Sequence, residues 1–353
     1  MLSGPTDFGA LKLSNRVVMA PLTRCRANIP VRVPTELMAE YYKQRASAGL
    51  IISEATSVDA MGVGYPDTPG IWSEEQVAGW ARIASAVHAA GGRMVLQLWH
   101  VGRVSDPVYL NGERPVAPSA IAPSGHVSLV RPLKPFEVPR ALETSEIPGI
   151  IAAYQRGAAN AKRAGFDGVE IHGANGYLLD QFLQDSSNTR TDAYGGTLEK
   201  RARLKIEVAQ ACVEVWGAGR VGMHLAPKCD SHGMGDSNPS ATFGYIAREL
   251  GKRRLAFICT REAQQPGAIG PEIGRIFKQA GGGGYIANEK FTGESAAGAI
   301  TSGESDAVAF GKLFIANPDL PRRLREKREL NVPRPELFYG PGAEGYTDYP
   351  AIT

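Results

Sequence analysis

The stretch GVEIHGANGYLLD, residues 168–180, joins a short β-rich run to a dense group of polar side chains. Residues 168–172 contain the β-branched Val169 and Ile171 and begin and end beside glycine, which indicates a strand. A histidine, an asparagine and a tyrosine follow at once. The pattern predicts a buried strand with a functional group of residues at its carboxyl end.

Seven other runs along the chain have the same β-rich, largely apolar character, typical of parallel strands buried on both faces. Together the eight predicted strands are Arg16–Ala20, Leu50–Glu54, Arg93–Trp99, Gly168–His172, Arg220–Leu225, Leu255–Cys259, Gly284–Ala287 and Ser305–Ala309. Helical signals lie between most of them. They include Ser73 followed by Gln76 as a capping box, Thr144 before a stretch that ends ahead of Gly165, and the stretches 197–216 and 240–251.

Eight strand–helix units in series predict a (β/α)8 TIM barrel. We expect one domain over residues 1–353, because no linker divides the chain. Residues 102–144 are rich in proline and lack a clear period, so we expect a lid-like insertion after the third strand. The tail from Asn331 is expected to be an ordered closing segment. The G-x-G-x-x-G match at 217–222 follows a helix and opens a strand, so it is interpreted as a tight loop.

Composition narrows the function class. The chain has 353 residues, 43% hydrophobic and 21% charged, with a net charge of +3. This balance does not favour a nucleic acid or an anionic membrane as partner. The four cysteines are scattered, and neither a signal peptide nor a membrane-spanning run is evident. We expect a cytoplasmic enzyme, a monomer or homodimer, that acts on small molecules without a metal.

Polar side chains gather at the carboxyl ends of the predicted strands, where barrels carry their active sites. His172 and Asn175 are three residues apart on a turn, so both are expected to donate to one substrate oxygen. Tyr177 offers a phenol that can deliver a proton. After the eighth strand, Gly311, Lys312 and the start of a short helix expected near 317–319 suggest an anion site. The sequence has no serine-hydrolase elbow and no H-E-x-x-H motif.

These motifs resemble the old yellow enzyme family, in particular its N-ethylmaleimide and pentaerythritol tetranitrate reductase branch. The resemblance runs from about Asn15 to Pro350. The segments that carry it are NRVVMAPLTR (15–24), EYYKQRASAGLIISEAT (40–56), GYPDTPGIWS (64–73), LQLWHVGR (96–103), GVEIHGANGYLLDQFLQDSSNTRTDAYGG (168–196), FIANPDLPRRL (314–324) and AEGYTDYP (343–350).

The resemblance implies a non-covalent FMN across the barrel mouth. The implied reaction is ping-pong: NADPH or NADH reduces the flavin, and flavin N5 then passes hydride to an electron-poor alkene such as an α,β-unsaturated carbonyl, a maleimide or a nitroalkene. The implied FMN contacts are Pro21, Leu22, Thr23, Ala55, Gln97, Gly311 and Lys312. His224 and Lys290 are expected to contact FMN as well, at positions that depart from the family pattern. His172 and Asn175 match the substrate-oxygen donors and Tyr177 the proton donor. Tyr65, Trp99 and Tyr339 match pocket walls.

Three departures from the family pattern concern the flavin. His224 stands where the fifth strand usually ends in an arginine, and Lys228 is a second cation that could take over its role. Lys312 replaces an arginine in the phosphate pair, and residues 288–291 read NEKF where small residues are usual. The alternatives are a reductase of nitrate esters or nitroaromatics on the same site, or a non-catalytic flavin redox sensor.

Overall fold

Eight parallel strands close into a barrel in the computed structural model, which describes residues 2–352. The barrel strands are β3 (Val17–Met19), β4 (Leu50–Ile52), β6 (Met94–Trp99), β9 (Gly168–His172), β10 (Val221–Leu225), β11 (Phe257–Arg261), β12 (Gly284–Asn288) and β13 (Ala307–Phe310). Each pairs with its neighbours in chain order, and β13 returns to β3 to close the ring. The predicted TIM barrel is confirmed. Several predicted boundaries were wrong by one or two residues; β4 ends two residues earlier than expected, and β11 begins and ends two residues later.

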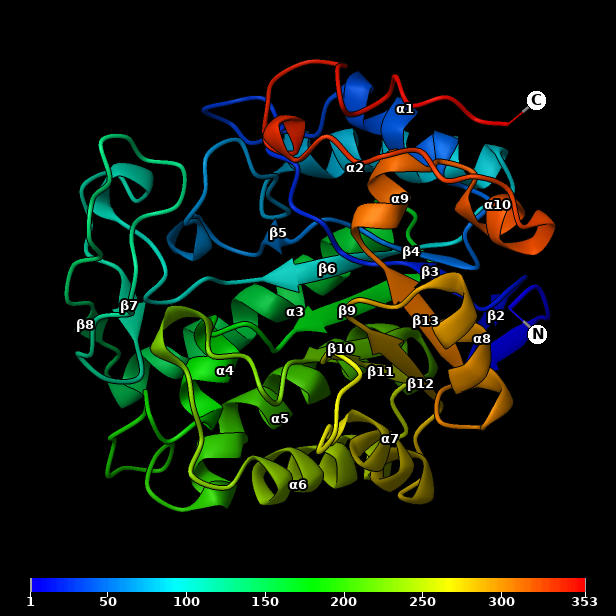
Figure 1. Cartoon of the computed structure of the whole chain (residues 1–353). Helices are drawn as coiled ribbons and strands as arrows, with labels where there is room; N and C mark the ends of the chain where they lie inside the picture. The colour runs from blue at the N-terminus through cyan, green and yellow to red at the C-terminus, as the bar shows by residue number, and fades with distance from the viewer. Residues whose placement is uncertain (1, 353) are drawn as a thin grey trace.

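Helices surround the barrel (Figure 1). They are α1 (Glu36–Gln44), α2 (Glu74–Ala89), α3 (Ile147–Arg163), α4 (Leu178–Leu183), α5 (Leu198–Trp216), α6 (Pro239–Lys252), α7 (Gly270–Gln279), α8 (Gly293–Thr301), α9 (Lys312–Ala316) and α10 (Leu320–Glu326). The Ser73–Gln76 capping box opens α2 as predicted. Helix α6 begins at Pro239, one residue before its predicted start, because the Asn238 side chain caps it. No helix within residues 2–352 is long and apolar enough to cross a membrane.

A hairpin at the N-terminus plugs one end of the barrel. Its strands β1 (Thr6–Phe8) and β2 (Leu11–Leu13) pair antiparallel, and Phe8 is fully buried among the inward-facing residues of the barrel strands. Glycines in the strands leave room for the ring of Phe8 and for that of Phe257 on β11. A Cβ at Gly284 would lie 2.0 Å from Phe8, and one at Gly222 would lie 2.2 Å from Phe257. The plugged end leaves the opposite, carboxyl end of the strands for a site.

The insertion after the third barrel strand lies at the end of the barrel away from this hairpin (Figure 1). It contains a two-residue strand, β7 (Val116–Ala117), which pairs with β8 (Arg140–Ala141). A further short strand, β5 (Thr56–Ser57), pairs with β6. Three apolar residues of the insertion, Val104, Val127 and Phe136, pack in one cluster with Trp99 and Ala55. The insertion therefore supports one side of the barrel mouth.

The C-terminal tail is ordered, as the sequence predicted, and three arginines near the start of the chain hold it. Arg24 donates to the carbonyls of Phe338 and Gly345, and Arg26 donates to several carbonyls between residues 337 and 344. Arg45 is fully buried and donates to the carbonyl of Tyr346 as well as to α9. The tail thus brings Phe338 and Tyr339 to the barrel mouth.

Candidate functional site

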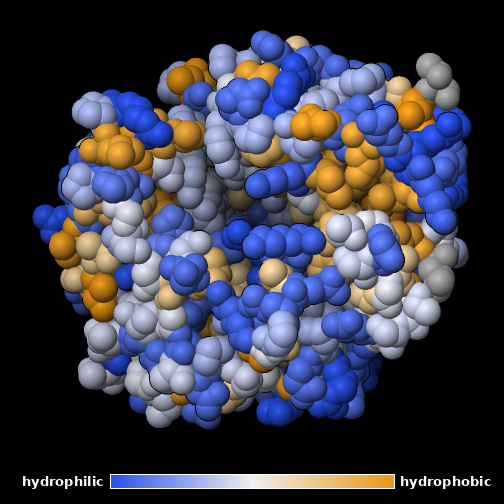
Figure 2. Space-filling model, in the orientation of Figure 1, coloured by the Kyte–Doolittle hydropathy of each residue, from blue (hydrophilic) through white to orange (hydrophobic). Residues whose placement is uncertain are grey.

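A cavity of about 470 Å³ opens at the carboxyl ends of the barrel strands. This is the end at which TIM barrels carry their chemistry, and the volume is within the usual range for small-molecule sites. Figure 2 shows it as a hollow near the middle of this face, with hydrophilic side chains along one edge. Of the residues predicted for the site, the cavity is lined by Pro21, Leu22, Thr23, Ala55, Gln97, Trp99, His172, Asn175, Tyr177, His224, Lys290, Gly311, Lys312 and Tyr339.

The imidazole of His172 is held with a hydrogen-bond donor free for the cavity. Its Nδ1 accepts from the backbone N–H of Ala174 at 3.3 Å. Burial lowers the pKa of His172 well below 6.5, and nearby His224, Arg261 and Lys205 act in the same direction. A neutral ring that accepts at Nδ1 carries its proton on Nε2. His172 therefore offers one N–H to a ligand.

Two buried charges brace the turn that carries Asn175 and Tyr177. Lys205 donates to the carbonyl of Gly173 at 2.8 Å, and Asp180 accepts from the N–H of Gly176 at 3.0 Å. The two side chains are fully buried and lie 3.7 Å apart. Burial lowers the pKa of Lys205 to about 8, although Asp180 partly offsets the effect. The backbone between His172 and Tyr177 is thus tied to the interior from both sides.

Aromatic rings form one wall of the cavity. The Tyr177 ring meets those of His172 and Trp99 edge to face, with centroids 4.9 and 5.0 Å apart. Tyr65 does not line the cavity but lies behind this wall, where its hydroxyl is 2.7 Å from that of Tyr177. Burial raises the pKa of Tyr177 well above 10, so the phenol keeps its proton at neutral pH.

A cluster of buried polar side chains lies beneath the cavity. Gln97 donates its amide to Glu170 at 2.7 Å, which leaves its oxygen as an acceptor. His224 lies with Nδ1 3.4 Å from the other oxygen of Glu170, too far for a normal hydrogen bond. Cys259 completes a trio whose atoms lie within 4.8 Å of one another. A metal ion could bridge such a spacing, but Glu170 already accepts from Gln97 and burial raises the pKa of the Cys259 thiol well above 9. We therefore assign the group to support of the cavity floor.

Two lysines mark a positive corner at the cavity rim. Lys290 and Lys312 are exposed, line the cavity and make no ion pair within residues 2–352. A short helix does start near 317–319, as predicted: α10 begins at Leu320, with Asp319 as its N-cap. Its residues do not line the cavity, however, whereas α9, which begins at Lys312 itself, does. Lys228 does not reach the cavity. It donates to the carbonyl of Gly267 and lies 3.8 Å from Glu262, so it does not stand in for the arginine that His224 replaces.

The chemistry of these residues fits the FMN that the resemblance implies. Pro21, Leu22 and Ala55 supply small and apolar surface for a flat ring system. The free Gln97 oxygen suits a ring N–H, and the two unpaired lysines suit a phosphate dianion. Glu289 would oppose that phosphate, but its carboxylate is paired with Arg261 at 2.5 Å. The cavity therefore offers an apolar part for the ring and a cationic part for the phosphate.

Sequence reasoning missed several residues of the cavity. They are Ala20, Arg261, Ala309, Phe310, Leu313, Ile315 and Phe338. The rule that strand ends carry chemistry would have identified Arg261, had β11 not been ended two residues early. Phe338 has no local signal, because a segment outside the barrel repeat brings it to the cavity.

Comparisons with known proteins agree with this geometry. The chain matches the NADH:flavin oxidoreductase / NADH oxidase family over residues 2–331. It is 43% identical to 12-oxophytodienoate reductase 1 of Oryza sativa subsp. japonica, over 99% of this chain and 92% of that protein.

Two solved structures resemble the chain over nearly its whole length. Morphinone reductase in complex with tetrahydroNAD is 47% identical, with a TM-score of 0.94 over 100% of this chain and 98% of that one. The old yellow enzyme homologue from Zymomonas mobilis is 45% identical, with a TM-score of 0.95 over 99% of both chains.

Proposed function

Because this chain belongs to the NADH:flavin oxidoreductase / NADH oxidase family, and within it to the old yellow enzymes, we propose that it reduces carbon–carbon double bonds activated by a carbonyl or nitro group. The chain is a nicotinamide-dependent flavin oxidoreductase with FMN as its cofactor. When bound, FMN takes hydride from NADH or NADPH and gives it to the substrate. Structural similarity to a morphinone reductase that holds a nicotinamide analogue supports a shared cavity for both half-reactions.

The observation that carries the proposal is the convergence of two N–H donors and a protonated phenol on one cavity. His172 and Asn175 hold the carbonyl or nitro oxygen and stabilise the negative charge that develops there as the double bond accepts hydride. Tyr177 delivers the proton to the α-carbon. A non-catalytic sensor would not need a proton donor beside two oxygen-binding groups.

The proposal is tested by a spectrum and two half-reactions. The purified protein should be yellow, and heat or acid should release FMN. After anaerobic reduction with NADPH, addition of 2-cyclohexenone should restore the oxidised flavin spectrum and form cyclohexanone. A protein whose reduced flavin is stable to 2-cyclohexenone and to nitroalkenes would refute the proposed activity.

The donor pair is tested separately by ligand binding. Replacing His172 or Asn175 by alanine removes a donor and should weaken binding of a phenol, which presents an enolate-like oxygen, by about tenfold. Isothermal titration calorimetry measures this without turnover. Unchanged affinity in both variants would contradict the assignment of the pair.

A further inference from the structure

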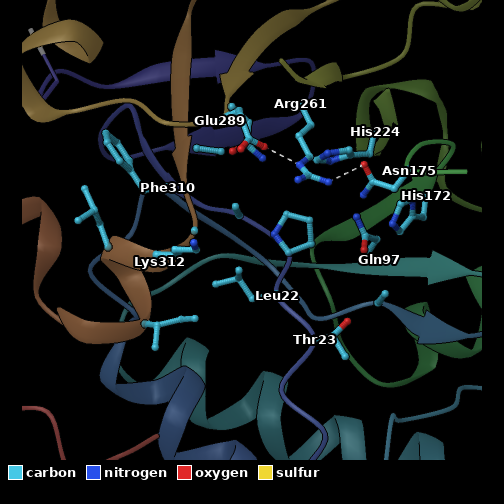
Figure 3. Close-up of a pocket in the computed structure, with 18 of the residues that line it drawn as sticks. Leu22, Thr23, Gln97, His172, Asn175, His224, Arg261, Glu289, Phe310 and Lys312 are labelled. Atoms are coloured by element: carbon cyan, nitrogen blue, oxygen red, sulfur yellow. Dashed lines mark hydrogen bonds and ion pairs between the residues drawn. The ribbon is translucent and has the colours of Figure 1, made fainter. Parts of the chain in front are cut away.

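The guanidinium of Arg261, at the end of β11, spans two other residues of the cavity. Its Nη1 donates to Oδ1 of Asn175 at 3.2 Å, and its Nε donates to Glu289 at 2.5 Å. Figure 3 shows the three side chains in a row along the cavity, with Arg261 in the middle. They come from three separate parts of the chain: the turn after β9, the end of β11 and the loop after β12. Nothing in the proposed function assigns a role to Arg261.

The bond from Arg261 decides which way the Asn175 amide faces. An asparagine amide has an acceptor and a donor side of nearly equal shape, so either can face a ligand. A guanidinium has only donors, and it therefore requires the amide oxygen. With Oδ1 turned toward Arg261, the NH2 group is left for the cavity (Figure 3).

Backbone conformation concentrates strain at both ends of this row. Asn175 has a φ of 58° and Glu289 a φ of 108°, both in the region that favours glycine. Such conformations persist where the surrounding contacts hold them, and they cluster at functional sites. Arg261 contacts both residues, and its ion pair with Glu289 prevents its guanidinium from turning away from Asn175.

We propose that Arg261, held by Glu289, is a positioning residue that turns the Asn175 amide so that its donors face the substrate oxygen. The inference rests on the proposed function, because it assumes that Asn175 binds that oxygen. With the amide held in this way, the site prefers ligands that present a hydrogen-bond acceptor, such as a carbonyl, nitro or phenolate oxygen, over ligands that present a donor at the same position.

A double-mutant cycle on ligand binding tests the inference. The probe is 4-hydroxybenzaldehyde, with its dissociation constant measured by isothermal titration calorimetry on the FMN-loaded protein. Arg261→Leu and Asn175→Ala should each weaken binding by about tenfold, and the double variant should bind no more weakly than Asn175→Ala alone. Glu289→Gln keeps an acceptor for Arg261 and should lose less affinity than Glu289→Ala. The control is Arg275→Leu, which removes an exposed ion pair on α7 and should bind normally.

Selectivity gives a second readout, which holds even if a variant loses stability. Wild-type protein should bind a phenol more tightly than the matching aniline. Arg261→Leu should reduce this ratio of phenol to aniline affinity, because the Asn175 amide can then turn its oxygen toward the amine. If Asn175→Ala itself leaves phenol affinity unchanged, the proposed function fails at that residue. Two results would refute the positioning role, given that Asn175→Ala weakens phenol binding. One is that Arg261→Leu weakens binding by the same factor in the wild type and in Asn175→Ala. The other is that Arg261→Leu leaves the ratio of phenol to aniline affinity unchanged.

Discussion

The Tyr177 hydroxyl lies 2.7 Å from that of Tyr65. In the function proposed above, it is needed only when the substrate accepts a proton. Tyr177→Phe should therefore slow alkene reduction by about 10²–10⁴-fold while reduction of the flavin by NADPH proceeds normally. Stopped-flow measurement of the two half-reactions separates these effects. Tyr65→Phe is the matched control, since it removes the neighbouring hydroxyl but keeps the donor, and it should cost about tenfold or less. Equal slowing of both half-reactions in Tyr177→Phe would identify Tyr177 as a packing residue.

Glu54 makes stability depend on pH in the direction opposite to most carboxyl groups. It is fully buried, and burial raises its pKa from 4.5 to about 7 despite hydrogen bonds from Tyr42 and the backbone of Arg24. The folded state then binds a proton that the unfolded chain releases between these two values. The free energy of unfolding should fall as pH rises through this window, by on the order of 3 kcal/mol from Glu54 alone.

Glu54→Gln should remove that contribution, because glutamine does not titrate. Urea unfolding of both proteins at pH 5 and pH 7.5 measures the difference. Parallel pH dependence in the wild type and the variant would show that Glu54 is charged in the folded protein at both values.

At the scale of elements, the fit of the N-terminal hairpin inside the barrel depends on glycines in the strands. A Cβ at Gly284 of β12 would lie 2.0 Å from the Phe8 ring. Gly284→Ala should lower the free energy of unfolding by about 1–3 kcal/mol, because the core must shift to accept the methyl group. Gly298→Ala on the exposed face of α8 meets no atom within 4 Å and should be neutral or stabilising by up to about 1 kcal/mol. Denaturant titration compares the two, and equal stability would mean that the hairpin packs loosely.

For the whole molecule, the contact between the first barrel helix and the C-terminal tail completes the cavity. Arg45 on the C-terminal side of α1 donates to carbonyls of Phe314, Ile315 and Tyr346 while fully buried. Arg45→Met leaves these carbonyls without their donor and should cost at least about 1–3 kcal/mol in the free energy of unfolding.

FMN release should also become faster in Arg45→Met, since the tail carries Tyr339 and Phe338 to the cavity. Arg82→Met is the control, because Arg82 pairs with Glu36 on the surface and such pairs contribute about 1 kcal/mol or less. Unfolding by urea and fluorescence of released flavin measure the two effects. A tail that contributes nothing to the cavity would leave the release rate unchanged.

The local pattern of the sequence was enough to predict the barrel and most of the cavity. Buried parallel strands are apolar over their length, and residues near the carboxyl end of such a strand lie at the rim of the barrel whatever surrounds them. For this reason His172, Gln97 and Gly311 could be located from the positions of strand ends alone. The resemblance to a known family added the expected FMN contacts.

Only the tertiary structure decided how these groups are oriented and charged. Arg261 reaches Asn175 across 86 residues of sequence. Glu289 pairs with Arg261, and Lys290 and Lys312 at the rim have no ion-pair partner among residues 2–352. Tyr65, matched to a pocket wall, lies instead behind Tyr177. The physical reason is that a hydrogen bond or an ion pair depends on the distance between its two partners and on their burial. The sequence pattern of one strand or helix gives neither the distance to a residue on another element nor the burial of that residue.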